Sequence, residues 1–129
     1  MQPIQLFALA SRQAEWLSVR QEVVAGNIAN ASTPKFRAKD LVPFDAELQS
    51  VGMQMARTNS AHMELAVAGG GKVALEDADL TNEIGVQESG NTVSLSKEMA
   101  KTGEIKGQFE LNAQLVRSFH SMMLTAVGK

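Results

Sequence analysis

The hydrophobic pattern predicts a first long helix from Ile4 to about Ala31. No proline interrupts this stretch, and Thr33 is displaced from the helical region because it precedes Pro34. On a wheel of about 100° per residue, the apolar side chains form two stripes. One stripe contains Leu6, Phe7, Ala10, Ala14, Leu17, Val24 and Ile28, and the other contains Leu9, Trp16, Val19 and Val23. Because one partner cannot cover both stripes, the helix needs two neighbours; Arg20 lies on the remaining face and is expected to meet water or polar groups.

A second long helix is predicted after Ser94 and continues nearly to Val127. Ser94 is a suitable N-cap, and Glu98 in the first turn is favoured by the helix dipole. The apolar residues occupy an arc of roughly 220°, wider than the stripe of an ordinary surface helix, so more than one neighbour is again implied. The arc contains Leu95, Ile105, Phe109, Leu111, Leu115, Val116, Phe119, Met122, Met123, Ala126 and Val127. A coiled-coil seam with alternating three- and four-residue spacing is predicted through Phe109, Asn112, Val116, Phe119, Met123 and Ala126.

The segment between these helices predicts less regular structure. A short helix is indicated by three residues at helical spacing, Leu48, Val51 and Met55. Met63, Leu65 and Val67 alternate with their neighbours as in a strand, and the glycines at 69–71 could turn this strand back onto residues 73–75.

The fold class predicted from these patterns is mainly α. The two long N- and C-terminal helices are expected to form a coiled-coil-like hairpin. Residues 1–33 and 92–129 would together make one coiled-coil domain, and residues 34–91 a loop-rich middle region with room for a short β-hairpin.

Composition narrows the function classes. A chain of 129 residues is the usual size of one domain, and a net charge of −2 gives no electrostatic footprint for nucleic acid. The absence of cysteine removes disulfides, thiolate nucleophiles and cysteine-ligated metals. The longest stretch without a charged residue, from Val23 to Pro34, is shorter than the ~20 apolar residues that span a bilayer. No transmembrane helix is therefore expected.

The sequence contains no complete motif for a phosphate-binding or metal-binding site. Gly71 and Lys72 lack the glycine and the Ser or Thr that a phosphate-binding loop requires around them. His62 and His120 have no ligand partner at helical spacing. The acidic cluster of Glu76, Asp77 and Asp79 does not follow the pattern of an EF-hand loop and is better interpreted as a solvated loop. We therefore expect no enzyme activity, no cofactor, no bound metal and no small-molecule substrate.

Two segments carry a family resemblance. Residues 27–36, Asn-Ile-Ala-Asn-Ala-Ser-Thr-Pro-Lys-Phe, resemble the N-terminal signature of the rod and hook proteins of the bacterial flagellum, which usually ends in Thr-Pro-Gly-Tyr. Residues 90–99, Gly-Asn-Thr-Val-Ser-Leu-Ser-Lys-Glu-Met, resemble the Gly-Asn-Thr-Val-Asp-Leu-x-x-Glu-Met segment typical of the proximal rod members of that family.

The resemblance implies a structural subunit of the proximal rod, the part of the basal body in the periplasm. It implies terminal helices that pack with those of neighbouring subunits into a hollow helical drive shaft. It further implies export by the flagellar type III apparatus without a cleavable signal peptide, self-association, and contacts with other rod proteins and the membrane-ring base. The subunit interface is expected to contain Leu6, Phe7, Leu9, Trp16, Leu17, Val23, Val24, Asn27, Ile28, Asn30, Pro34, Phe36, Phe109, Val116, Phe119 and Met123.

Departures from the family pattern generate separate expectations. Lys35 replaces the usual glycine after Pro34, which predicts a type I or extended path in place of a type II turn. Ser94 replaces the usual aspartate and is expected still to cap its helix. Gly103 and Gly107 lie on the polar arc, where they are expected to soften the helix locally rather than to admit a neighbour.

Two alternatives stay open on the sequence. A non-polymerising helical binding module or export adaptor would need only one apolar stripe. A metal-dependent hydrolase would instead use the acidic cluster from Glu76 to Asp79.

Overall fold

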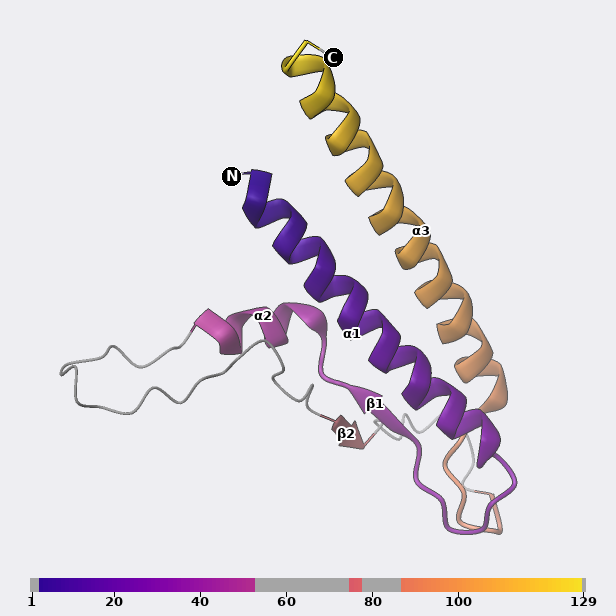
Figure 1. The fold of residues 1–129 in the computed structure, drawn as a ribbon. Coiled ribbons are helices and arrows are strands. Elements are labelled where there is room, and N and C mark those ends of the chain that lie inside the picture. Colours follow the sequence, from indigo (N-terminus) through magenta and orange to yellow (C-terminus); the bar gives the residue numbers. More distant parts are fainter. Residues whose placement is uncertain (1–2, 53–74, 78–86, 129) are drawn as a thin grey trace, which may run out of the picture.

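The computed structural model describes residues 3–52, 75–77 and 87–128. Two long helices, α1 (Pro3–Ala29) and α3 (Leu95–Ala126), lie side by side and antiparallel, with both chain ends at the same end of the hairpin (Figure 1). Between them in sequence are β1 (Lys39–Leu41), α2 (Phe44–Gly52) and β2 (Leu75–Asp77). The predicted mainly α fold with two long terminal helices is confirmed.

The helix ends follow the predicted signals with one exception. α1 ends at Ala29, where the Asn30 N–H contacts the carbonyl oxygens of both Gly26 (3.1 Å) and Asn27 (3.2 Å) and the helix tightens into turns. α3 begins directly after Ser94, but the predicted side-chain cap is wrong, because the Ser94 hydroxyl makes no capping hydrogen bond. That hydroxyl lies 3.2 Å from the hydroxyl of Ser96 instead.

The middle region contains a small antiparallel sheet of two strands. β1 and β2 are antiparallel, with Leu41 opposite Leu75 and Lys39 opposite Asp77. Leu75 therefore pairs with a strand close to α1. Residues 63–67, expected to form the other strand of the hairpin, lie outside the described part of the chain together with Met55. The short helix predicted at Leu48 and Val51 is confirmed as α2, and Pro43 accepts its first backbone hydrogen bonds.

A continuous seam joins α3 to α1. From Phe109 to Met123, the α3 residues that are not exposed follow alternating spacings of three and four. They are the residues of the predicted seam, except that its last member, Ala126, is exposed. Near the upper end of the hairpin, the rings of Phe7 and Phe119 meet edge to face with centroids 5.8 Å apart.

The second stripe of α1 is covered by the chain's own middle region. The indole N–H of Trp16 donates to the carbonyl oxygen of Val42 (3.1 Å), and the Trp16 ring lies 5.8 Å from that of Phe44. Leu41 joins the same buried cluster, and Val19 and Val23 pack against it. The two neighbours predicted for α1 are therefore α3 and the segment containing β1 and α2.

The wide apolar arc of α3 is only partly covered. Within the described ranges, six large hydrophobic side chains of α3 are exposed: Leu95, Met99, Leu111, Leu115, Met122 and Leu124. Val127, directly after the helix, is 75% exposed. The surplus of apolar surface predicted for α3 is therefore present in the single chain.

Replacing Gly103 or Gly107 by alanine should stabilise the purified chain. A Cβ atom added at either position meets no other atom within 4 Å, so the methyl group enters open space. Each substitution should raise the free energy of unfolding by about 1 kcal/mol, because glycine is the weaker helix former. Urea denaturation followed by circular dichroism at 222 nm measures the change. A loss of stability would show that these positions need glycine within the single chain.

Candidate functional site

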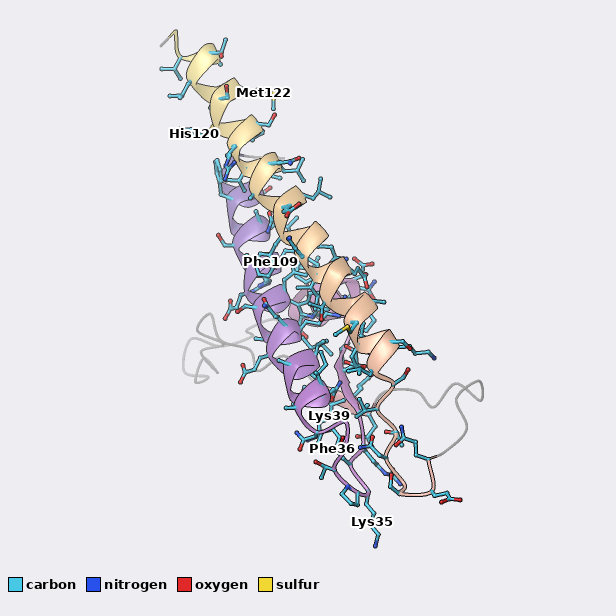
Figure 2. All side chains as sticks on the ribbon, turned by 90° about the vertical axis from the view of Figure 1, so that its right-hand side faces the viewer. Lys35, Phe36, Lys39, Phe109, His120 and Met122 are labelled. Carbon is cyan, nitrogen blue, oxygen red and sulfur yellow. The ribbon has the colours of Figure 1, made fainter. Side chains whose placement is uncertain are left out.

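The two signature segments, residues 27–36 and 90–99, meet at the lower end of the hairpin, close to Lys35, Phe36 and Lys39 (Figure 2). They are far apart in sequence, but hydrogen bonds join them at several points. This junction and the apolar groove higher up between α1 and α3 are the two candidate sites of the described residues.

Asn27 is the centre of the junction and is only 1% exposed. Its side-chain amide donates to the carbonyl oxygen of Lys39 (2.7 Å) and to the Glu98 carboxylate (3.0 Å). Its side-chain oxygen accepts a hydrogen bond from the Lys39 N–H (3.0 Å). Both hydrogens of the amide and its oxygen are thus satisfied within the chain, and one side chain ties α1 to β1 and α3.

A network of charged groups continues from this residue. Glu98 is 3% exposed, and its carboxylate lies 3.2 Å from the ammonium group of Lys101. The same ammonium group lies 2.7 Å from the carboxylate of Asp40, and Arg20 lies 3.7 Å from that carboxylate on its other oxygen. Arg20, expected on a polar face, also stacks over the Trp16 ring at 5.3 Å.

The network shifts the pKa values of two of its members. Burial by itself raises the pKa of Asp40, but the hydrogen bonds from Lys101 and the Leu41 N–H and the nearby positive charges outweigh it. The pKa of Asp40 is therefore below its ordinary value of 3.8. Burial by itself lowers the pKa of Lys101, but Asp40 and Glu98 favour the charged form and hold the pKa above its ordinary value of 10.5.

Asn91 closes the open end of α1. Its amide nitrogen lies 2.8–2.9 Å from the carbonyl oxygens of Asn30, Ala31 and Thr33, so its two hydrogens serve three acceptors. Its oxygen accepts from the Val93 N–H (2.7 Å). These three residues follow Ala29, the last residue of α1, so the second signature segment supplies partners for carbonyl groups of the turns that end the helix.

The turn at Pro34 is a type II turn, and the predicted type I or extended path is wrong. Lys35 has a φ of 59°, and the Phe36 N–H donates to the carbonyl oxygen of Thr33 (3.3 Å). Two contacts hold this strained backbone: the Lys35 N–H donates to Ser89 (2.9 Å), and Phe36 accepts from the N–H of Thr92 (3.1 Å). Contacts with the second segment thus impose a conformation that costs a lysine about 1–2 kcal/mol.

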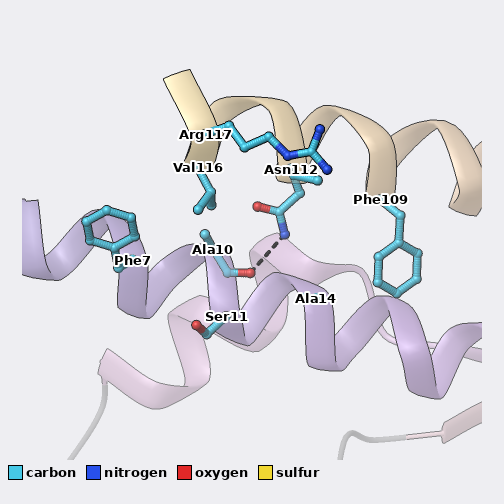
Figure 3. Close-up of a pocket in the computed structure, with 9 residues that line it drawn as sticks. Phe7, Ala10, Ser11, Ala14, Phe109, Asn112, Val116 and Arg117 are labelled. Carbon is cyan, nitrogen blue, oxygen red and sulfur yellow. Dashed lines mark hydrogen bonds between the residues drawn. The ribbon is translucent and has the colours of Figure 1, made fainter. Parts of the chain in front are cut away.

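A groove of about 360 Å³ lies higher up between the two long helices (Figure 3). Phe7 and Phe109 stand at its ends, and Ala10, Ala14 and Ala113 line it with small apolar surface. Other lining residues are Ser11, Asn112, Val116 and Arg117. Asn112 bridges the helices by donating to the carbonyl oxygen of Ala10 (2.8 Å), as the dashed line in Figure 3 shows.

The structure distributes the predicted interface residues over three environments. Four are buried within the chain, namely Trp16, Leu17, Val24 and Asn27. Eleven are half-buried, namely Leu6, Phe7, Leu9, Val23, Ile28, Asn30, Phe36, Phe109, Val116, Phe119 and Met123, and Pro34 is exposed. Their contact with other subunits stays a prediction, because a single chain presents no neighbour.

Sequence reasoning missed two sets of residues. The interface prediction omitted Leu111, Leu115 and Met122, although the width of the apolar arc was a signal for them. It also assigned no partners to Asn91 or Lys101, whose partners come from distant segments. No group of metal-binding side chains occurs among the described residues, where Asp77 of the acidic cluster faces Arg37 at 3.9 Å. None of the described helices is long and apolar enough to cross a membrane.

Comparisons with known proteins agree on one family. A family model described as flagella basal body rod protein matches residues 9–37, which span most of α1 and the turn. The flagellar basal body rod protein FlgB of Agrobacterium fabrum is 64% identical over the whole chain and 97% of its own length. FlgB of Proteus mirabilis is 31% identical over 89% of the chain and 90% of its own length. FlgB of Escherichia coli is 33% identical over 72% of the chain and 71% of its own length.

Replacing Asn27 by leucine should lower the free energy of unfolding of the purified chain by about 2–4 kcal/mol. The substitution keeps the branched shape and the number of heavy atoms but leaves the Lys39 backbone groups and one side of Glu98 without partners. Thr33→Ala, which removes only an exposed hydrogen bond, is the matched control and should change stability by less than about 0.5 kcal/mol. Urea denaturation of both variants measures the two changes in the free energy of unfolding. Unchanged stability of Asn27→Leu would mean that Asn27 acts between subunits and not within the chain.

The Asp40 network should make stability depend on pH at both extremes. The pKa of Asp40 is lowered on folding. Its contribution to the free energy of unfolding is therefore complete above pH 3.8 and is lost as the pH falls through its pKa in the folded state. The pKa of Lys101 is raised on folding. Its contribution to the free energy of unfolding is therefore complete below pH 10.5 and is lost as the pH rises through its pKa in the folded state.

The variant Asp40→Asn isolates the acid limb of this dependence. It should be less stable than the wild type by about 1–2 kcal/mol at pH 7, since a charge-assisted hydrogen bond is weakened at a partly exposed site. The difference should shrink as the pH falls below 3.8. Thermal denaturation of both proteins between pH 7 and pH 2 measures it, and a difference independent of pH would contradict the assignment.

Proposed function

Because the chain belongs to the FlgB family of flagellar basal body rod proteins, we propose that its two terminal helices build it into the rod as part of a hollow helical shaft. It is a structural subunit of the rod and not an enzyme. Its association with other rod components follows from the family. The proposal adds the means of assembly, which is burial of the apolar surface that α3 leaves exposed.

The observation that carries this proposal is the exposed apolar surface of α3. Leu111, Leu115 and Met122 are 57%, 56% and 58% exposed, although they lie on a regular helix. Burial of apolar surface stabilises association by about 25 cal/mol per Å² before the entropic cost of association. Several such side chains on one helix favour contact with other helices of the same kind.

The junction between the two signature segments at the lower end of the hairpin supports a mechanical role. Asn27 and Asn91 connect the end of α1 to the start of α3 by hydrogen bonds on both sides of the turn. Asn112 adds a third connection higher up. A load applied to one helix is therefore passed to the other through directional bonds as well as through apolar packing. Torque would be transmitted in this way, by passive continuity and without any chemical step.

The location and the partners are proposed at a finer level. We place the subunit in the proximal rod within the periplasm, where it would contact copies of itself, other rod proteins and the membrane-ring base. It would reach this place through the flagellar type III export apparatus without cleavage of a signal peptide. The adaptor alternative requires a single apolar stripe, and it is not favoured by the membership of the family.

A deletion strain complemented with the wild-type chain tests the function. Cells without the chain should be non-motile, and basal bodies purified from complemented cells should retain the chain after washing in detergent and salt. Quantitative immunoblotting against a known basal-body protein measures its amount, and cryo-electron microscopy locates it. Restored motility with no chain in purified basal bodies would favour the adaptor and contradict the proposal.

A further inference from the structure

An exposed ridge and an apolar groove lie on opposite faces of the α1–α3 hairpin. The ridge consists of Leu111, Leu115 and Met122, each more than half exposed. The groove is the one bounded by Phe7 and Phe109. Ala113 and Arg117 line the groove, and each follows a ridge leucine by two residues, which is about 200° around a helix.

The two faces also differ in what already covers them. The network of Asp40 with Arg20 and Lys101 packs β1 onto the ridge side at the lower end of the hairpin. The residues lining the groove all come from α1 and α3, so neither β1 nor α2 covers that side. Each face therefore keeps its own uncovered apolar surface in the upper half of the hairpin.

The ridge carries no charge. On the helical wheel, four uncharged residues lie beside the ridge along α3, and all four are exposed: Gly107, Gln114, Ser118 and Thr125. The charged residues in this stretch, Glu110 and Arg117, lie about a third of a turn or more away from the ridge. An exposed helical flank of this length without charge is suited to a partner with an uncharged apolar surface.

The groove presents a mostly apolar surface, with Arg117 as the charged residue of its lining. Its small side chains, among them Ala10, Ala14 and Ala113, leave space between two phenylalanine rings for branched or flexible apolar side chains. Leucine and methionine side chains fit this description. The groove and the ridge therefore match in shape and in the apolar character of most of their side chains.

Starting from the proposed function as a rod subunit, we propose that the ridge of one copy of this chain docks into the groove of the next copy. A two-fold dimer would place one face against itself and leave the other face exposed. A head-to-tail contact covers both faces in every copy except the terminal ones. Because such a contact joins two different faces, it repeats from copy to copy and builds either an open array of hairpins or a ring.

Cysteine crosslinking in assembled basal bodies tests this contact, since the natural chain has no cysteine. The variant Ala113→Cys/Leu115→Cys carries one thiol on the groove side and one on the ridge side. The two lie about 200° apart on one helix, so they cannot form a disulfide within a chain. Mild oxidation should produce a ladder of dimers, trimers and larger species on a non-reducing gel, and neither single variant should produce one.

The control pair is Ala113→Cys/Ser121→Cys. Ser121 is exposed on the edge of α3 turned away from α1, and eight residues separate the two thiols on the helix. This pair should give no ladder. Dimers formed by Leu115→Cys alone would indicate a two-fold contact between ridges and would overturn the proposal.

A second pair of variants covers the case in which a cysteine variant does not assemble. Leu115→Asp should reduce the amount of chain in basal bodies at least tenfold, and Ser121→Asp should leave it unchanged, because both positions are exposed in the single chain. Normal incorporation of Leu115→Asp, or of the double-cysteine variant without a ladder, would overturn the contact and leave the rod function intact. Absence of the wild-type chain from basal bodies would overturn the rod function itself.

Discussion

The hydrogen bonds of the Asn27 side chain are the constraint on which the arrangement of the other elements depends. The apolar seam between α1 and α3 repeats every three or four residues, so a slide of one helix along the other would still bury apolar surface. The same slide would separate Glu98 from Asn27 and Lys101 from Asp40, and would leave the buried Glu98 carboxylate with Lys101 of its own helix as its remaining partner. Each lost hydrogen bond to a charged group costs about 1.5–3 kcal/mol. The polar contacts therefore set the register that the apolar seam by itself leaves open.

The two ends of the hairpin have different tasks. At the lower end, the side chains of Asn27 and Asn91 satisfy nearby backbone groups, and the described residues have no buried side-chain polar atom without a hydrogen bond. At the upper end, Phe7 and Phe119 make the last ring contact between the helices, while large apolar side chains of α3 face outward. The lower end of the hairpin thus holds the polar contacts that fix the fold, and the upper end presents apolar surface to neighbours.

The sequence predicted those features that depend on neighbouring residues. The absence of proline between Ile4 and Ala31 and the spacing from Phe109 to Met123 were sufficient for both helices and for the seam, because periodicity is a local property. The pairing of Leu75 with Leu41 was not predictable, since nothing local to Leu75 identifies a partner strand so distant in the chain.

One error and one omission near the signature segments have the same origin. For Lys35, the local preference against a positive φ was considered, but the hydrogen bonds from residues 89–92 that impose it were not visible in the sequence. Asn27 was predicted to contact other subunits, and no role was predicted for Asn91. Their partners within the chain became identifiable only when the fold brought the two segments together.

The pairing of β1 with β2 has a consequence for the architecture as a whole. Because Leu41 and Leu75 are opposite each other, the connection between them begins and ends at the same place in the fold. The entropic cost of closing such a connection rises by only about 0.6 kcal/mol for each doubling of its length. Segments of different length could therefore replace the one between α2 and β2 without a change in the two long helices. This connection is thus where related chains can differ in the surface they present.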